Sequence, residues 1–263
     1  MISVVIHTYN SEKHLRDVLE TVKDFDEILI CDMESTDTTL EIAKQYNCRV
    51  VTFPKKDYTY PEPARDYAIH EAKHPWVLVL DSDETITNDL KTYLYNFIKQ
   101  DNDINGIRIP RKNYFLGRFM HGKYPNYQLR FFKKSKAYWP PYVHTQVQVE
   151  GKIIAIPRNK RHLAITHLEN DTVYKIIEKA NRYTNLEIER RKAKKYGIIS
   201  FIWRPFYGFF DMYIKHGGFL DGKAGYIYAK LESVYQIVML SKIMAEKLAS
   251  QLHFHQADNS AKC

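Results

Sequence analysis

Two carboxylates one residue apart follow an apolar run in the first half of the chain. Residues 76–80 are apolar, and Asp81 and Asp83 come directly after them. Such a run is typical of a strand buried on both faces of a parallel sheet, and ligands bind at the carboxyl ends of such strands. Two acids this close favour a cation between them. A solvated turn is the alternative, because Asp and Ser are ordinary turn residues.

The strand that carries this pair is the fourth in a series of strands that alternate with helices. The predicted strands span residues 2–7, 26–32, 49–53 and 76–80. The first helix begins at residue 10 or 11, with Leu15, Val18, Leu19 and Val22 on one face. A second carries Leu40, Ala43 and Tyr46, and a third spans residues 64–72. Strands alternating with helices of about ten residues predict an α/β fold with a mostly parallel central sheet flanked by helices.

The pattern changes after a further predicted helix at residues 88–99. Short strands are expected at 106–110, 128–132, 145–149 and 153–156, and helices at 171–195 and 224–249. Between these helices, residues 198–214 form the most apolar segment of the chain. Arg204, Pro205 and Asp211 interrupt it, and it is too short to span a bilayer. It is either an interfacial segment with aromatic residues at headgroup depth or a buried structural helix.

Charge is distributed unevenly along the 263 residues. Residues 1–110 hold 12 Lys and Arg against 20 Asp and Glu, whereas residues 111–263 hold 27 against 11. The basic part is expected to meet an anionic membrane surface or a phosphorylated acceptor, because aromatic residues are interleaved with the charge. No nucleic-acid-binding module is recognisable, so nucleic acid is not an expected partner.

The cysteines and the N-terminal sequence bear on the cellular compartment. Cys31, Cys48 and Cys263 have no metal-binding spacing, and the N-terminus lacks the features of a signal peptide. We therefore expect a reducing, cytoplasmic compartment.

Two further polar residues accompany the acid pair at the predicted carboxyl edge of the sheet. Asp32 ends the second strand, and Arg65 lies at the start of the third helix. A carboxylate can accept a hydrogen bond from a base, an arginine can approach phosphates, and a divalent metal can neutralise a diphosphate. Together these residues indicate a site for a nucleotide-diphosphate donor.

Four short motifs resemble those of the family 2 glycosyltransferases, which have a GT-A fold. They are Val-Val-Ile-His-Thr-Tyr-Asn at 4–10, Asp-Met-Glu-Ser-Thr-Asp at 32–37, Ala-Arg-Asp-Tyr-Ala at 64–68 and Leu-Asp-Ser-Asp-Glu at 80–84. Glu34 stands where the family usually has Gly. Segments 110–117, 127–132 and 218–222 resemble the branch that contains the lipopolysaccharide-core β-1,4-glucosyltransferases. The resemblance covers about residues 1–240.

The resemblance implies an inverting hexosyltransferase that acts on a glycan or lipid-linked oligosaccharide, such as lipopolysaccharide core, at the inner face of the bacterial plasma membrane. Residues 1–105 would bind the nucleotide sugar, and residues 106–168 would form acceptor-side strands and loops of the same domain. Residues 169–263 would form a helical, basic and aromatic extension. The implied donor-binding residues are Thr8, Tyr9, Asn10, Asp32, Arg65, Asp81, Ser82 and Asp83.

The resemblance also implies a divalent metal, Mn²⁺ or Mg²⁺, held by Asp81 and Asp83, with His144 as a further candidate ligand. Implied acceptor-binding residues are Arg111, Tyr127 and Arg130. A carboxylate would deprotonate the attacking hydroxyl.

The general base is less well defined by the sequence. Members of this branch often carry acids where this chain has Asn126 and Thr145. His144 and Glu84 are the candidate catalytic residues, Glu150 is a further carboxylate, and His167 is a weaker candidate for catalysis or metal binding.

Two other functions are compatible with parts of the sequence. Segment 80–85 also fits the strand and DxDxT opening of haloacid-dehalogenase-like phosphatases, with Asp81 as nucleophile. That motif usually ends the first strand of its domain, and no later Gly-Asp-x-x-x-Asp cluster follows here. The other alternative is a catalytically silent glycosyltransferase-like protein that binds a glycan or nucleotide without turnover.

Overall fold

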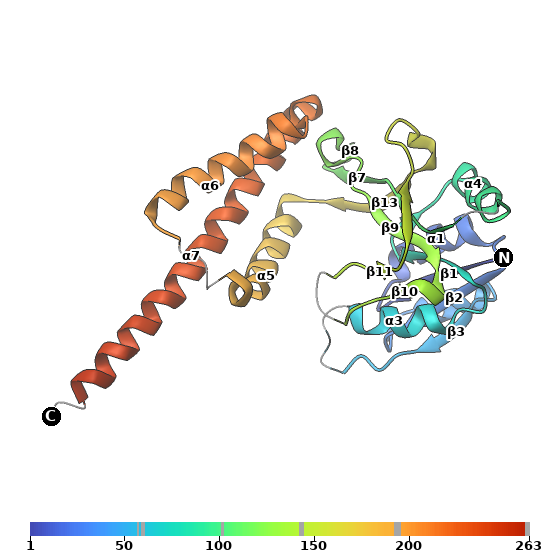
Figure 1. Cartoon of the computed structure of the whole chain (residues 1–263), viewed down its shortest axis with the longest axis horizontal. Helices are drawn as coiled ribbons and strands as arrows, with labels where there is room; N and C mark the ends of the chain where they lie inside the picture. The colour runs from blue at the N-terminus through green and yellow to red at the C-terminus, as the bar shows by residue number, and fades with distance from the viewer. Residues whose placement is uncertain (57, 59–60, 101–102, 142–144, 192–195, 261–263) are drawn as a thin grey trace. The chain divides into compact units, whose positions relative to one another are not determined.

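The structure is a computed structural model, and it describes the chain except for residues 57, 59–60, 101–102, 142–144, 192–195 and 261–263. The described chain divides into two compact units. Unit 1 consists of residues 1–113 and 124–169, and unit 2 consists of residues 114–123 and 170–263. Figure 1 shows the helices and strands along the chain.

Unit 1 is built on a seven-stranded sheet in the order β12-β6-β9-β4-β1-β2-β3. Its strands are β1 (Ile2–Thr8), β2 (Glu27–Asp32), β3 (Arg49–Thr52), β4 (Trp76–Asp81), β6 (Ile104–Ile109), β9 (Gln128–Lys133) and β12 (Lys152–Ala155). β1 pairs in parallel with β2 and β4, and β2 with β3, whereas β9 runs antiparallel to β4 and β6. The four βα strands and the mostly parallel sheet that the sequence predicts are confirmed.

Helices cover both faces of this sheet. Alternate residues of β1 belong to two different hydrophobic clusters, one on each face of the sheet, because successive side chains of a strand point to opposite faces. Ile2, Val4 and Ile6 pack with α1 (Glu12–Val22), α2 (Thr39–Gln45) and α4 (Asn88–Ile98). Val5 faces the other side, where α3 (Glu62–Glu71) packs. The result is a three-layer α/β/α arrangement with the core on both sides of the sheet.

The helical faces in this unit agree with the sequence pattern except in α2. Leu15, Val18, Leu19 and Val22 of α1 are all buried, as their spacing predicts. In α2 the buried residues are Thr39, Ile42 and Ala43. Of the apolar residues that the sequence predicts in this helix, Ala43 is buried and Leu40 is 40% exposed. Ile42 and Ala43 are the residues of α2 that pack against the sheet.

Several short strands complete the sheets. They are β5 (Glu84–Thr85), β7 (Arg111–Phe115), β8 (Arg118–Phe119), β10 (Ala137–Tyr138), β11 (Gln148–Val149) and β13 (Ile165–Asp171). β5 pairs antiparallel with β13, with His167 opposite Glu84. The strand expected at 145–149 is reduced to its last two residues, which pair with β10. β13 was not anticipated from the sequence.

Unit 2 is mainly helical. It contains α5 (Val173–Arg191), α6 (Ile198–Phe210), a π-helical turn (Asp211–Lys215) and α7 (Gly222–Ser260). Figure 1 shows α6 and α7 side by side, and both α5 and α6 contact α7. Among the described residues, no helix is long and apolar enough to cross a membrane.

A buried aspartate and closely packed glycines hold the first part of unit 2 together. Asp221 accepts hydrogen bonds from the backbone nitrogens of His121 at 2.7 Å and Gly122 at 3.0 Å. A Cβ at Gly225 would lie 1.9 Å from the carbonyl oxygen of Gly218, so this approach requires glycine. Residues 121–122 are thereby anchored to a segment 100 positions later in the chain.

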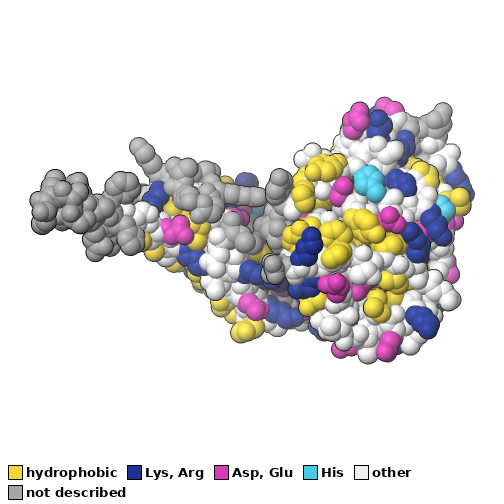
Figure 2. All heavy atoms as spheres, turned by 90° about the horizontal axis from the view of Figure 1, so that it is seen from below, with side chains coloured by type: hydrophobic (Ala, Val, Ile, Leu, Met, Phe, Trp, Pro, Cys, Tyr) yellow, Lys and Arg dark blue, Asp and Glu magenta, His cyan; other side chains and the backbone are white. Residues whose placement is uncertain are grey.

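Surface side chains of different types are mixed over the face drawn in Figure 2. Hydrophobic groups lie between Lys, Arg, Asp and Glu on that face. Single exposed apolar residues are normal in soluble domains, whereas large contiguous apolar surfaces mark interaction sites. Among the described residues, α6 carries more of the large exposed apolar side chains than the other elements do.

Candidate active site

Asp32 is held at the carboxyl end of β2 by a small hydrogen-bond network. Its carboxylate accepts from the Thr8 hydroxyl at 2.7 Å and from the Ser35 hydroxyl at 2.6 Å. The backbone nitrogen of Ser35 donates to it at 2.8 Å. Asp32 and Thr8 are buried, and they lie opposite each other in the parallel β1–β2 pairing. Parallel strands end at the same edge, so the two motifs meet there.

The loops after β1, β2 and β3 are joined by two residues in the left-handed region. Asn10 has φ +48° and Glu34 has φ +62°. The backbone nitrogen of Thr36 donates to Asn10 Oδ1 at 2.8 Å, and the backbone nitrogen of Lys55 donates to Glu34 Oε2 at 3.2 Å. The turn at which the resemblance implies glycine is therefore formed with glutamate. The side chain of Lys55 lies over the Tyr9 ring, 4.6 Å from its centroid.

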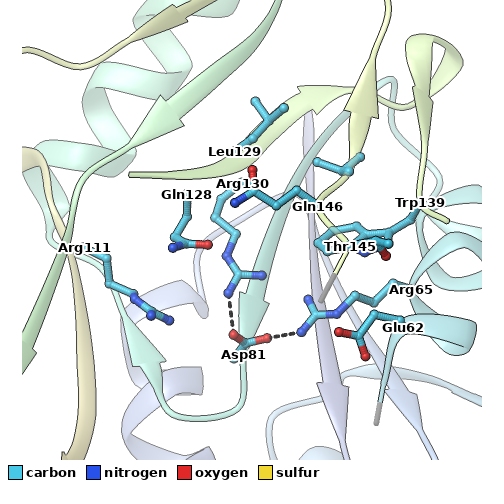
Figure 3. A pocket seen from close by; sticks show the side chains of 11 residues that line it. Glu62, Arg65, Asp81, Arg111, Gln128, Leu129, Arg130, Trp139, Thr145 and Gln146 are labelled. Carbon is cyan, nitrogen blue, oxygen red and sulfur yellow. Dashed lines mark hydrogen bonds and ion pairs between the residues drawn. The ribbon is translucent and has the colours of Figure 1, made fainter. Parts of the chain in front are cut away.

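Asp81 lies between two arginines at the end of β4, as Figure 3 shows. Arg65 Nη2 donates to Asp81 Oδ1 at 2.7 Å, and Arg130 Nη2 pairs with Asp81 Oδ2. Burial alone would raise the pKa of Asp81, but the charges of Arg130 and Arg65 hold it well below its usual range. Asp81 is therefore an anion whose charge is shared by two cations.

Glu84 is the second carboxylate of the network that Asp81 and the arginines form. It has no exposed surface; its Oε1 accepts from Arg111 Nη1 at 2.8 Å and from Arg130 Nη2 at 3.1 Å. The backbone nitrogen of Asp81 donates to Glu84 Oε2 at 3.1 Å. Both carboxylate oxygens are thus engaged. This geometry suits a residue that orients arginines.

Asp83 faces a different partner from Asp81. Its Oδ2 lies 3.1 Å from Nε2 of His167, and both side chains are partly accessible. His167 reaches this position because β13 pairs with β5, directly after the acid pair. The carboxylate and the imidazole are both common metal ligands. The structure thus brings together Asp83 and a histidine that the sequence ranks below His144.

A pocket of about 190 Å³ opens beside Asp81. Its lining includes Arg65, Arg111 and Arg130, together with Trp139 and Gln128. The Arg65 guanidinium stacks on the Trp139 ring, 4.6 Å from its centroid. Among the described residues, three buried donors of this lining have no hydrogen-bond acceptor: Arg65 Nη1, Arg130 Nε and Trp139 Nε1. Buried donors of this kind are normally satisfied, so the pocket is suited to an oxygen-rich, anionic ligand.

Three other residues that the sequence predicts for the site are Ser82, Tyr127 and His144. Ser82 donates from its hydroxyl to Ser11 Oγ at 2.9 Å. Tyr127 is half-buried, its hydroxyl donates to the carbonyl of Ile156 at 2.8 Å, and it does not line the pocket. His144 lies outside the described residues. His7, next to Asp81 in the β1–β4 register, is buried, and burial together with the charge of Arg65 lowers its pKa well below 6.5.

Sequence reasoning gave too little weight to His167 and Trp139. The signal for His167 was available in the alternation of Ile165, Thr166 and His167, which is typical of a strand. No local pattern marks Trp139, because its place depends on the fold of the loop after β10. Within the described residues, no three His, Cys, Asp or Glu side chains are grouped closely enough to hold a metal ion by themselves.

Comparison with known proteins identifies the family. A family model described as glycosyl transferase family 2 matches residues 3–150. The chain is 25% identical over 256 residues to the lipopolysaccharide core biosynthesis glycosyltransferase LpsC of Rhizobium meliloti strain 1021, covering 92% of this chain and 91% of that protein. It is 31% identical over 129 residues to the poly(ribitol-phosphate) β-glucosyltransferase of Bacillus spizizenii strain W23, which covers 42% of this chain and 20% of that protein.

A solved structure agrees with this on the fold. The mannosyltransferase PcManGT from Pyrobaculum calidifontis, in complex with GDP-Man and Mn²⁺, superposes with a TM-score of 0.55 at 12% identity. The match covers 94% of this chain and 87% of that one. Because the family model spans more than half of the sequence, the chain belongs to glycosyl transferase family 2, and it is a glycosyltransferase with a GT-A fold.

Proposed function

We propose that this glycosyltransferase binds a nucleotide-diphosphate sugar at the carboxyl edge of β1, β2 and β4 and transfers its sugar to a hydroxyl with inversion. The observation that carries the proposal is the meeting of Asp32, Arg65, Asp81 and Asp83 at this edge beside the arginine-lined pocket. Thr8 and Asp32 would hold the nucleoside, with Tyr9, Asn10 and Ser82 in the surrounding loops. The buried donors of Arg65 and Arg130 would receive oxygens of the diphosphate.

The residues present fit a divalent cation that the donor helps to hold. Mn²⁺ and Mg²⁺ bound with substrate phosphates need one or two protein carboxylates, so a set of three protein ligands is not required. Asp83 and His167, 3.1 Å apart, with the anionic Asp81 beside them, would hold the metal. When bound, Mn²⁺ or Mg²⁺ would supply positive charge that stabilises the departing nucleoside diphosphate. PcManGT, the fold neighbour, contains Mn²⁺ and a nucleotide sugar.

The arginines would also stabilise the departing diphosphate, and they would stay positively charged while they do so. Asp81 and Glu84 raise the pKa of Arg130 against the opposing effect of burial, so its charge is constant. Glu84 orients Arg130 and Arg111, both of which line the pocket. Preorganised cations of this kind favour a transition state in which negative charge develops on the diphosphate. We assign Glu84 to this positioning role.

The acceptor is proposed to be a hydroxyl of a lipopolysaccharide-core or similar cell-surface saccharide. The support is the match to LpsC, which extends over nearly the whole of both chains. Arg111 and Arg130 would contact the acceptor or the diphosphate from the pocket wall. With the general base on a residue near this pocket, the hydroxyl would lose its proton as it attacks the anomeric carbon.

The test is release of nucleoside diphosphate from a panel of nucleotide sugars with Mn²⁺ or Mg²⁺, with lipopolysaccharide-core saccharide present as the acceptor and water as the acceptor in a parallel hydrolysis assay. Asp83→Ala and His167→Ala are each expected to lower turnover about 100-fold or more, because the metal supplies several kcal/mol of stabilisation. Asp24→Ala is the matched control, since Asp24 is an exposed carboxylate paired with Lys91.

Mn²⁺ binding in the presence of nucleoside diphosphate, measured by calorimetry, gives a readout that does not need turnover. The Asp83 and His167 variants should bind Mn²⁺ at least about tenfold more weakly than the control. Full activity and full Mn²⁺ affinity in Asp83→Ala would refute the metal assignment. Binding of donor without any release of diphosphate would instead identify a silent binding protein.

A further inference from the structure

The most extensive exposed apolar surface of the described chain lies on α6. Seven large side chains of this helix are exposed: Ile198, Ile199, Ile202, Trp203, Phe206, Tyr207 and Phe210. They form two rows with a spacing of four residues, one from 198 to 210 and one from 199 to 207, and therefore a single face of the helix. Ile199 is 80% exposed and Trp203 is 60% exposed. We refer to these seven residues as the α6 face.

The opposite side of α6 is already occupied by α7. Pro205 is buried, and its carbonyl accepts a hydrogen bond from the Ser233 hydroxyl at 2.8 Å. Arg204 Nε donates to Gln236 Oε1 at 3.4 Å, and Gly208 lies against Glu232 and Gln236. The helix is thus fixed to α7 by one side, and the α6 face is not the side that builds the core of unit 2.

The rim of the α6 face is cationic. Lys215, Lys223 and Lys230 are exposed around the end of α6 and the start of α7, and the Lys215 side chain is 64% exposed. In residues 196–231 the two carboxylates are Asp211 and Asp221. Asp211 is engaged with Lys215 and His216, and Asp221 is buried. Three exposed lysines thus stand against one carboxylate that is not buried, and Lys230 Nζ lies 4.8 Å from the ring centroid of Phe209 on α6. We refer to these three lysines as the cationic rim.

We propose that the α6 face is a membrane-docking surface that lies flat in the interface of a bilayer containing anionic lipid. An in-plane helix of this kind inserts its apolar side between headgroups and acyl chains, and its lysines pair with anionic headgroups. Trp203 and Tyr207 are the residue types enriched at that depth. A second copy of the chain is a poorer occupant, because pairing two α6 faces would bring their cationic rims together.

The chain carries a built-in probe of this docking. Of its three tryptophans, Trp76 and Trp139 are buried in unit 1, whereas Trp203 lies on the α6 face. Vesicles of phosphatidylcholine with phosphatidylglycerol should shift the emission of the full chain to shorter wavelength, and acyl-brominated lipid should quench it. The Trp203→Phe variant should show neither the emission shift nor the quenching. It should still co-sediment with the vesicles, because Phe keeps the α6 face apolar.

Two double variants separate the α6 face from bulk charge. Ile199→Glu with Ile202→Glu should lower the partition coefficient onto these vesicles about 100-fold or more, since two apolar side chains that would insert into the bilayer are lost. Leu40→Glu with Tyr138→Glu makes the same charge change at exposed positions of unit 1 and should lower partitioning less than about threefold. Circular dichroism checks that both variants are folded.

Several results would overturn the proposal. One is equal loss of binding in the two double variants, which would assign binding to net charge. Another is unchanged Trp203 emission on co-sedimented chain. A third is a parent chain that does not bind vesicles and sediments as a dimer without lipid, when the variant Ile199→Glu with Ile202→Glu sediments as a monomer. All these measurements are independent of sugar transfer, so they stand or fall separately from the proposed reaction.

Discussion

Arg130 joins the two carboxylates at the centre of the buried charge network, and its removal tests that network. The side chain is 5% exposed and binds both Asp81 and Glu84. Arg130→Met keeps much of the volume but leaves a buried charge less well compensated. Breaking a buried pair in this way costs about 3–5 kcal/mol. For a chain of this size such a loss lowers the melting temperature by about 10 °C.

The assay is thermal and urea unfolding followed by tryptophan emission in a Trp203→Phe background. Trp76 and Trp139 then report on unit 1, which contains the network. Arg49→Met is the matched control, because Arg49 also binds two carboxylates, Glu27 at 3.4 Å and Glu71 at 2.9 Å. Its side chain is 34% exposed, and buried Glu27 keeps hydrogen bonds from the Ser3 hydroxyl and the backbone nitrogen of Lys73, so we expect a loss of about 1 kcal/mol.

The pH dependence of the Arg130 variant gives a second check with a definite sign. In the parent chain the lowered pKa of Asp81 contributes stability above the pKa of an unfolded carboxyl, and this is lost as the pH falls through the folded value. Without Arg130, burial of Asp81 is opposed by Arg65 and Arg111 alone, so the pKa of Asp81 is higher than in the parent chain and the variant takes up this proton earlier as the pH falls through the acidic range. The difference in unfolding free energy between the two proteins should narrow over that range. Equal losses for Arg130→Met and Arg49→Met, with no narrowing, would refute the reasoning.

Two smaller perturbations test local backbone features of unit 1. Glu34→Gly should stabilise the chain by about 1 kcal/mol in urea unfolding, because Glu34 has φ +62° and glycine adopts that region without strain. Glu34→Ala keeps the strain and loses the contact with Lys55, so a rise in stability there would contradict this reason. Thr87→Ala should destabilise by about 1–2 kcal/mol, because Thr87 Oγ1 caps α4 by accepting from Leu90 N at 3.2 Å. Thr87→Ser should retain most of that stability, and equal losses in the two variants would show that the cap is unimportant.

The βα half of the fold could be predicted because its signals are local. Apolar runs such as 76–80 mark buried strands, and the spacing of Leu15, Val18, Leu19 and Val22 marks the buried face of α1. The carboxyl edge of a parallel sheet then brings Asp32 and Asp81 together without further information. The motif residues of the first 84 positions are therefore placed by periodicity and topology alone.

The second half was less predictable because its strands are short and its contacts are distant in sequence. β5 has two residues, and it pairs with β13 about 80 positions later. That pairing, which no local pattern encodes, brings His167 to Asp83. Likewise the contacts of Arg130 with Asp81 and Glu84 could not be predicted, because they depend on the place of β9 between β4 and β6 in the sheet. Leu40 shows a smaller limit, since a helix of seven residues has too few apolar positions to define its buried face from the sequence.

The way the chain passes between the two units has a consequence for its synthesis. The chain leaves unit 1 after Asn113, returns at Tyr124 and leaves again after Glu169. The hairpin of residues 114–123 finds its anchor, Asp221, only when the ribosome has made the C-terminal helices. A truncated product ending near residue 169 would therefore carry that hairpin without the carboxylate that accepts from the backbone nitrogens of His121 and Gly122. Producing unit 1 alone would require replacing residues 114–123 by a short polar turn, and a C-terminal deletion by itself would be insufficient.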